Sequence, residues 1–568
     1  MKKTAAFFND NRKKVWFALL LNAAALAVLV LLMRPKFESN DEFSLASFYN
    51  LCRPGQDIRS LFENVILGSL TAALYRLTTA VPWYTVTQYA ALFAGFTAVT
   101  WVIMQKFRGR TAMLLFCLMM MTFGREGYII VSFTKTAGFT AAMGTCLLLY
   151  FIEQEKFSLK GSLTAALIIL FGAMFRWSAF LSTAAVTAVY GIYLILKLFR
   201  KSEKGRWLRQ VRVWVLTLLP VAVLVIGTKA VDNAVIRTSP ETMHYKEYTA
   251  LRSRIMDHGF PEYEGNEEAF NAIGINENAW KLYKKWNFYD TEKFSIPVME
   301  KIRDIWDADR RDLSTTVKDF FGVYPRYFFV NRVFPVYLMM LALFFVYGKK
   351  NRESVITVVF QLVLLLGLFF YLYWDGRSGL NRVDAGLWMS GCLTLLLLLG
   401  ESDMDMKPRE VFVVLAGVLI MIQTQWRTDY RTETANRRSQ MLQYQDVLEG
   451  VSAATDHLYR FETCNSIVSY GYGPWDSVPV GLMNNMGGLG GWSTESPLQR
   501  KILDSYGVGN PYRDMIGNEK VLIYGDDIDM IVEYLHDYYD DNCYAKEAGE
   551  VNGRTVYWIA DPDTEETE

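Results

Sequence analysis

The sequence predicts a polytopic α-helical membrane protein, and three observations lead to this fold class. Of its 568 residues, 52% are hydrophobic and 15% are aromatic. The apolar residues are gathered into runs of about 18 to 22 residues, the length that crosses the hydrocarbon core of a bilayer. The charged residues lie between these runs and close to their ends. We therefore expect about eleven transmembrane helices and a C-terminal α/β domain outside the membrane.

The first predicted span covers residues 15–33, and no small-residue cleavage site follows it, so we expect it to be retained. The next stretch, 61–80, is amphipathic and is interrupted by Glu63 and Arg76, which is typical of a helix lying at the membrane surface. The remaining predicted spans are 83–104, 111–130, 136–152, 162–177, 178–198, 211–231, 326–347, 354–374, 384–400 and 410–427.

Lysine and arginine in the short loops predict the orientation. The N-terminus and the loops 106–110, 197–212 and 347–354 carry the excess of positive charge, and all of them fall on one side of this path. Short loops rich in Lys and Arg face the cytoplasm. We therefore expect a multi-pass protein of the plasma membrane with a cytoplasmic N-terminus and an extracytoplasmic C-terminal domain.

The chain divides into four predicted parts. Two are membrane-embedded, namely an N-terminal core at 1–231, whose first outer loop is 34–82, and a second group of helices at 326–428. The segment 232–325 is polar and aromatic and has helical spacing in places, so we expect an extracytoplasmic helical loop domain there. The last part, 429–568, is the predicted extracytoplasmic α/β domain.

Local signals support the α/β prediction for the last part. Residues 521–527 (VLIYGDD) predict a strand followed by a helix start, and Asn552-Gly553 between two alternating runs predicts a β-hairpin. The glycine-rich stretch 483–492 fits no nucleotide-binding motif and predicts a tight loop over the membrane face. An extracytoplasmic location would permit a disulfide between Cys464 and Cys543.

Charged residues gather at the predicted outer ends of the spans, and charges at membrane depth are costly and by default suggest function. Arginine binds phosphate with a permanent charge and a bidentate fork, and a nearby carboxylate can take a proton from an acceptor hydroxyl. The pattern therefore predicts group transfer from a lipid-linked phosphate. The residues concerned are Asp41, Glu42, Arg125, Glu126, Lys135, Arg176, Asp375, Arg377, Arg382 and Asp384.

Each of these residues also has a purely structural interpretation. An acid just beyond a span is often part of a solvated loop, and Arg176 could cap a helix or extend its head group to the interface. Arg377 and Arg382 could pair with Asp375 and Asp384 in a closed loop. Glu126 could simply neutralise Arg125.

Composition and the remaining motifs exclude other classes of function. The formal net charge is zero, which gives no reason to expect a nucleic-acid partner. None of the four histidines lies near a cysteine, which argues against a zinc site. Asp403-Met404-Asp405 forms a D-x-D sequence, but it falls in a predicted short cytoplasmic loop and is interpreted as solvated. We therefore expect no cofactor.

The layout resembles the GT-C superfamily of polytopic membrane glycosyltransferases. The first span is followed by Asp41-Glu42 in the first outer loop, by the amphipathic stretch 61–80, by many further spans and by a terminal extracytoplasmic domain. The segments 245–265 and 273–290 also resemble uncharacterised membrane proteins of Gram-positive bacteria. A second D-x-D motif in an outer loop is lacking, so the resemblance does not imply a divalent metal.

The resemblance implies a polyprenyl-phosphate sugar donor and a carboxylate base in the first outer loop. That base would be Asp41, with Glu42 as its neighbour or substitute. The implied donor-phosphate ligands are Arg125, Lys135, Arg176, Arg377 and Arg382. The predicted function is transfer of the sugar to a cell-envelope glycan, lipid or protein with inversion. The alternatives are a polysaccharide polymerase of the O-antigen-polymerase type and a non-enzymatic transporter or flippase of lipid-linked glycans.

Overall fold

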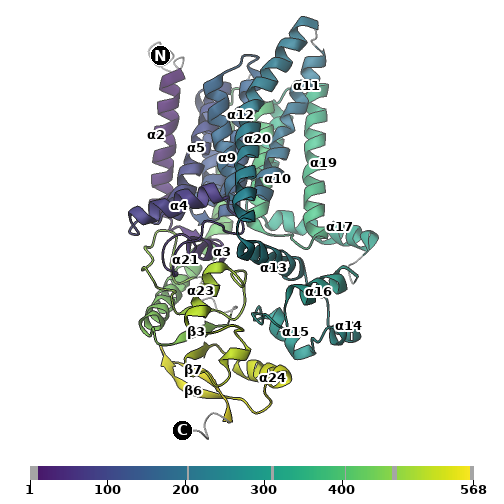
Figure 1. Ribbon diagram of the computed structural model, residues 1–568. Helices are drawn as coiled ribbons and strands as arrows, with labels where there is room; N and C mark the ends of the chain where they lie inside the picture. Colours follow the sequence, from purple (N-terminus) through teal and green to yellow (C-terminus); the bar gives the residue numbers. More distant parts are fainter. Residues whose placement is uncertain (1–10, 201–203, 309–311, 403, 463–469, 563–568) are drawn as a thin grey trace.

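The protein is described by a computed structural model that covers residues 11–200, 204–308, 312–402, 404–462 and 470–562. Long helices form a bundle, and a smaller domain built on a β-sheet lies at one end of it (Figure 1). The bundle contains α2 (Asn11–Leu32), α5 (Trp83–Lys106), α6 (Gly109–Met119), the π-helical turn η1 (Met120–Gly124), α7 (Arg125–Tyr128), α8 (Phe133–Glu153), α9 (Leu159–Phe175), α10 (Trp177–Ala188), α11 (Tyr190–Arg200), α12 (Lys204–Arg237), α18 (Phe334–Tyr347), α19 (Arg352–Trp374), α20 (Asn381–Leu399) and α21 (Pro408–Ala453).

The chain is a polytopic α-helical membrane protein. Seven helical stretches within the described residues are long and apolar enough to cross a membrane: Asn11–Leu32, Trp83–Lys106, Phe133–Glu153, Trp177–Arg200, Trp207–Arg237, Arg352–Trp374 and Asn381–Leu399. The predicted number of eleven is not established, because the other four stretches depart from single long apolar helices. The stretch 111–130 contains η1, 162–177 is a shorter helix, 326–347 is broken between α17 and α18, and 410–427 is only the start of α21.

Two helices form the centre of the bundle. Of the apolar stretch in each of α8 and α20, 89% is buried, whereas only 11% of that in α2 is buried. Small residues allow the central helices to approach closely, as is common in membranes. A Cβ atom on Gly138 of α8 would lie 3.5 Å from the Cα atom of Gly386 of α20, and one on Gly172 of α9 would lie 2.7 Å from the carbonyl oxygen of Ala137.

The two ends of the bundle differ in charge. At one end, here called the basic end, Lys14 donates to the carbonyl of Met104, Lys106 pairs with Glu153, and Arg200 pairs with Glu353. The segments whose positive charge predicts the cytoplasmic side therefore lie together. Which side of a membrane this end faces stays a prediction.

The other end, here called the sheet end, carries short elements of the first loop. Strand β1 (Lys36–Phe37) pairs in parallel with β2 (Ile130–Val131), and α3 (Asp41–Ala46) follows. Helix α4 (Val65–Leu77), which falls within the predicted amphipathic stretch, lies across the ends of the long helices (Figure 1). Its N-cap Asn64 accepts a hydrogen bond from the amide of Ile66, which fixes where the helix begins.

The segment between α12 and α18 is helical. It contains α13 (Pro240–Met256), α14 (Glu267–Ala272), α15 (Glu277–Lys284), α16 (Ile296–Ala308) and α17 (Leu313–Val330). Ser239 and Asn276 cap α13 and α15. Helix α15 buries Trp280 and Tyr283 in an apolar core that this part shares with the sheet domain, which contributes Ile523, Ile531 and Leu535 among others.

The sheet domain is reached through α21, which continues without a break past residue 428, where the sequence predicted a domain boundary. The sheet has the order β4 (Met486–Gly488), β3 (Leu458–Phe461), β5 (Val521–Tyr524), β7 (Arg554–Ala560) and β6 (Tyr544–Val551). Strands β4, β3 and β5 run parallel, and the β6–β7 hairpin is antiparallel. At its turn, Asn552 and Gly553 have φ angles of 50° and 72°, as a type I′ turn requires.

Among its described residues, this domain also contains helices α23 (Pro497–Ser505) and α24 (Ile528–Tyr538) and the 3₁₀ turn η2 (Arg513–Met515). Cys543 is buried, whereas Cys464 lies outside the described residues, as does Asp403 of the D-x-D sequence.

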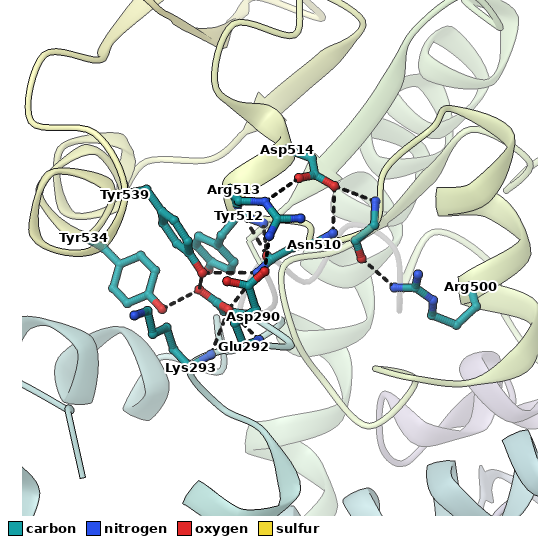
Figure 2. A network of polar contacts seen from close by, with 11 residues as sticks. Asp290, Glu292, Lys293, Arg500, Asn510, Tyr512, Arg513, Asp514, Tyr534 and Tyr539 are labelled. Atoms are coloured by element: carbon teal, nitrogen blue, oxygen red, sulfur yellow. Dashed lines mark hydrogen bonds and ion pairs between the residues drawn. The ribbon is translucent and has the colours of Figure 1, made fainter.

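A buried carboxylate joins the helical segment to the sheet domain (Figure 2). Asp290 accepts hydrogen bonds from the hydroxyls of Tyr534 and Tyr539 at 2.7 and 2.6 Å and from the side-chain amide of Asn510 at 3.0 Å. The backbone N–H groups of Glu292 and Lys293 donate to it as well. With both oxygens occupied, this carboxylate holds the two parts together.

Candidate functional site

A cavity of about 410 Å³ lies where the sheet end of the bundle meets the helical segment and the sheet domain. This volume is in the range of sites that bind small molecules. Four of the residues singled out from the sequence line it together: Asp41, Arg176, Arg377 and Arg382.

Local structure explains why these four side chains meet. Asp41 is the first residue of α3, and Arg382 lies in the first turn of α20, so both stand at helix starts on the sheet end. Arg176 occupies the extended residue that separates α9 from α10. Arg377 lies in the turn between α19 and α20. One guanidinium nitrogen of Arg382 lies 3.8 Å from the Asp41 carboxylate.

Two further arginines line the cavity and were not predicted. Arg252 comes from α13, and Arg53 comes from the loop after α3. Arg53 is 4% exposed, its Nε donates to the hydroxyl of Ser47 at 2.9 Å, and its Nη1 donates to the Gln499 side chain at 3.1 Å. In the sequence, Arg53 stands out only as a cation in the same outer loop as Asp41. Its burial depends on a contact with Gln499, which is distant in the sequence.

The cavity carries more positive than negative charge. Five arginines line it, against the carboxylates of Asp41, Asp257 and Glu462. Asp257 is shared by Arg252 at 3.4 Å and Arg377 at 3.5 Å. An excess of guanidinium groups in a partly dehydrated site favours an anionic ligand.

Two of the five arginines have no carboxylate partner in the part of the chain that the structure describes. Arg53 is hydrogen-bonded only to neutral side chains. Arg176 donates to the hydroxyl of Thr134 at 2.7 Å, and its guanidinium lies 5.1 and 5.3 Å from the ring centres of Phe62 and Phe133. Both cations are held in place without being neutralised, and they therefore remain available to an anion.

No family model and no curated protein matches this sequence. Among solved structures, ArnT from Cupriavidus metallidurans in the apo state is similar with a TM-score of 0.40 and 11% identity, over 95% of this chain and 97% of that chain. The structure of the same protein bound to undecaprenyl phosphate gives a TM-score of 0.38 and 12% identity, over 96% and 97%. The likeness extends over nearly the whole of both chains but is too weak to carry an argument about chemistry.

Glu42 does not line the cavity, although it is next to Asp41. Its carboxylate is fully buried and accepts hydrogen bonds from the amide of Phe133 at 3.0 Å and from the hydroxyl of Tyr84 at 3.0 Å. Burial raises the pKa of Glu42 to about 8 in spite of these donors. Asp41 and Glu42 therefore point into different surroundings.

Arg125 and Lys135 also lie away from the cavity. Lys135 is fully buried and pairs with Glu126 at 2.7 Å and with Glu38 at 2.9 Å. Arg125 pairs with Glu126 at 2.9 Å. We call Glu38, Arg125, Glu126 and Lys135 the closed network, because each cation in it faces a carboxylate.

The loop between α19 and α20 is not neutralised internally. Asp375 pairs with Arg254 at 3.2 Å and contacts His258 at 3.0 Å, and Asp384 contacts the amide of Asn331. Arg377 and Arg382 are thus directed elsewhere, toward the cavity. Among the described residues, no group of three or more His, Cys, Asp and Glu side chains could hold a metal ion.

Proposed function

We propose that this protein is a membrane glycosyltransferase of GT-C type that uses a polyprenyl-phosphate sugar and acts on the extracytoplasmic face. The observation that carries the proposal is the group of five arginines around Asp41, of which Arg53 and Arg176 have no acidic partner in the described chain. Guanidinium groups suit a phosphate that must be bound as the substrate and then released as an anion. The position at the end of a helical bundle suits a ligand whose hydrocarbon tail stays in the membrane.

In the proposed reaction, the hydroxyl oxygen of the acceptor attacks the anomeric carbon of the donor sugar. The bond between that carbon and the phosphate oxygen breaks, and its electron pair leaves with the polyprenyl phosphate. Asp41 takes the proton of the acceptor hydroxyl as general base. Arg53, Arg176 and Arg382 stabilise the charge that develops on the leaving phosphate. A single displacement inverts the anomeric configuration, and the acceptor is a glycan, lipid or protein of the cell envelope.

The base assignment is tested with Asp41→Asn in lipid nanodiscs. Transfer of labelled sugar from polyprenyl-phosphate donors to envelope extracts should fall by about 100-fold or more, because a general base contributes about 10²- to 10⁴-fold. Binding of polyprenyl phosphate should persist. Asp456→Asn, which alters an acid whose side chain is 77% exposed, is the matched control. Transfer at the normal rate by Asp41→Asn would remove Asp41 from the mechanism.

The same assay separates the alternatives. A polymerase would extend glycan chains from a diphosphate-linked donor and would depend on the arginines while tolerating Asp41→Asn. A flippase would move labelled lipid across the bilayer without releasing free polyprenyl phosphate.

A further inference from the structure

Part of the cavity wall is supplied by the sheet domain rather than by the membrane helices. Phe461 is the last residue of β3 and is followed by Glu462, while Gly487 and Gly488 end β4. The loop after β4 contributes further lining residues at 490–493. Because β3 and β4 are neighbours and parallel, their carboxyl ends open on the same side, which is where parallel sheets bind ligands.

Glycine is required at the end of β4 and in the loop after it because the backbone approaches other segments closely. A Cβ atom on Gly490 would lie 1.8 Å from the carbonyl oxygen of Trp286, and one on Gly487 would lie 2.2 Å from Nε2 of Gln499. Gly491 has a φ angle of 93°, which side chains disfavour. The loop therefore brings main chain, free of side chains at these positions, to the cavity wall.

Glu462 is a carboxylate held in place on this wall. It is 8% exposed, and its Oε1 accepts a hydrogen bond from the backbone N–H of Asp527. Gly525 leaves the space that the carboxylate occupies, since a Cβ there would lie 2.2 Å from Cδ of Glu462. The backbone of Asp526 also hydrogen-bonds to this carboxylate. A carboxylate oriented in this way at the cavity wall can accept further hydrogen bonds from the hydroxyl groups of a ligand.

Aromatic rings flank the same part of the cavity. Trp492 is 8% exposed and stacks on Phe48 with 5.8 Å between ring centres. The ring of Trp286 lies 5.2 Å from the guanidinium of Arg252. Indole rings offer broad apolar faces in defined positions, and the carboxylate and main chain offer hydrogen bonds. This combination suits a ring that carries hydroxyl groups and has apolar faces.

We infer that Glu462 and the segment 487–493 of the sheet domain, together with Trp286 of the helical segment, form the subsite that binds the transferred sugar through its hydroxyl groups, so that the sheet domain takes part in selecting the donor. The inference rests on the proposed function. In the donor, the sugar is bonded directly to the phosphate, so a phosphate among the arginines places the sugar in the same cavity. Glu462 repels a second phosphate there, and a neutral sugar is accepted. The acceptor is not bonded to the phosphate before transfer, so binding of the phosphate by the arginines does not place the acceptor in this subsite.

The test compares short-chain polyprenyl phosphate with its glucosyl, galactosyl, mannosyl and N-acetylglucosaminyl phosphodiesters, binding to the full chain in nanodiscs of neutral lipid. At least one sugar should improve the affinity over bare polyprenyl phosphate. Glu462→Gln, Glu462→Ala and Trp492→Leu should each reduce this improvement, by about 10-fold for Glu462→Ala, as loss of a hydrogen bond to a charged group predicts. The affinity of these variants for bare polyprenyl phosphate should stay within about two-fold of that of the wild type, since the phosphate is bound by the arginines. Glu519→Gln, an exposed acid of the same domain, is the matched control.

Two results would overturn the inference. One is that no sugar improves binding over bare polyprenyl phosphate; the other is that the Glu462 variants weaken bare and glycosylated lipids equally, which would show a structural role. If bare polyprenyl phosphate itself does not bind, the proposed function fails, and that outcome is separate from both.

Discussion

The arginine cavity and the closed network contain the same kinds of residue at the same end of the bundle, but their charges are balanced differently. In the closed network, the buried amine of Lys135 lies within 2.9 Å of both Glu38 and Glu126. In the cavity, Arg53 and Arg176 are fixed by hydroxyl, amide and aromatic groups instead. The difference teaches that a buried charge at the end of this helical bundle indicates a ligand site when its counter-charge is missing. Where the counter-charge is present, the group holds helices together.

The largest effect that we expect comes from breaking the closed network. Lys135→Met should destabilise the folded protein by about 3–5 kcal/mol, because removing one partner of a buried pair leaves the other charge uncompensated. The change is measured as the shift of the unfolding transition in detergent titrations. Molecules that remain folded should still bind polyprenyl phosphate.

The double variant Lys135→Met with Glu38→Gln is the control for this prediction. Glu38 pairs with Lys135, whereas Glu126 keeps Arg125 as a partner, so removing the Glu38 charge should recover part of the lost stability. If Lys135→Met folds as well as the wild type but loses phosphate binding, the two regions have been assigned the wrong way round.

Local features of the fold could be predicted from the sequence. The amphipathic pattern of 61–80 predicted a helix, and α4 occupies Val65–Leu77 across the ends of the long helices, while its place at a membrane surface stays a prediction. The turn residues Asn552-Gly553 predicted the β6–β7 hairpin. Both signals lie within a few residues of the structure that they specify, so no distant contact could override them.

The division of the charged residues could not be predicted. The π-helical turn Met120–Gly124 changes the rotation of the helix just before Arg125 and Glu126, and helical periodicity does not reveal it. Arg53 is buried through a contact with Gln499, 446 positions later. Asp41 and Glu42 are adjacent in sequence, but the first turn of α3 directs them to different neighbours.

The second prediction compares the neighbours Asp41 and Glu42, because Asp41 lines the cavity whereas Glu42 is fully buried away from it. In the folded protein, burial raises the pKa of Glu42 to about 8, from an ordinary value of 4.5. Below about pH 4.5 the Glu42 carboxyl is protonated in both the folded and the unfolded protein, and its contribution to stability is complete. Between pH 4.5 and about pH 8, unfolding releases the proton, so the contribution is lost as the pH rises. Above about pH 8 the loss levels off.

Glu42→Gln removes this titration and serves as the test. The stability of the wild type relative to the variant should fall by about 3–4 kcal/mol between roughly pH 5 and pH 8. The free energy of unfolding in nanodiscs is measured at each pH. Sugar transfer should respond far less than in Asp41→Asn. Parallel stability curves for wild type and variant would show that Glu42 is already ionised in the folded protein.

The smallest effect on free energy is expected at the unpaired arginines, where it should appear in binding rather than in stability. Arg53→Ala and Arg176→Ala should each weaken binding of polyprenyl phosphate by about 10- to 100-fold, as loss of a charged hydrogen bond predicts. Neither variant leaves a described carboxylate without its cation, so each should unfold nearer to the wild type than Lys135→Met does. Arg53→Lys should retain part of the affinity, because the charge remains while the planar fork is lost.

Arg303→Ala is the control for this prediction. It alters a partly exposed arginine of α16 that pairs with Asp304, and it should bind polyprenyl phosphate as the wild type does. Normal binding by Arg53→Ala, or a loss of stability equal to that of Lys135→Met, would place Arg53 with the structural charges and leave the cavity without its distinguishing feature.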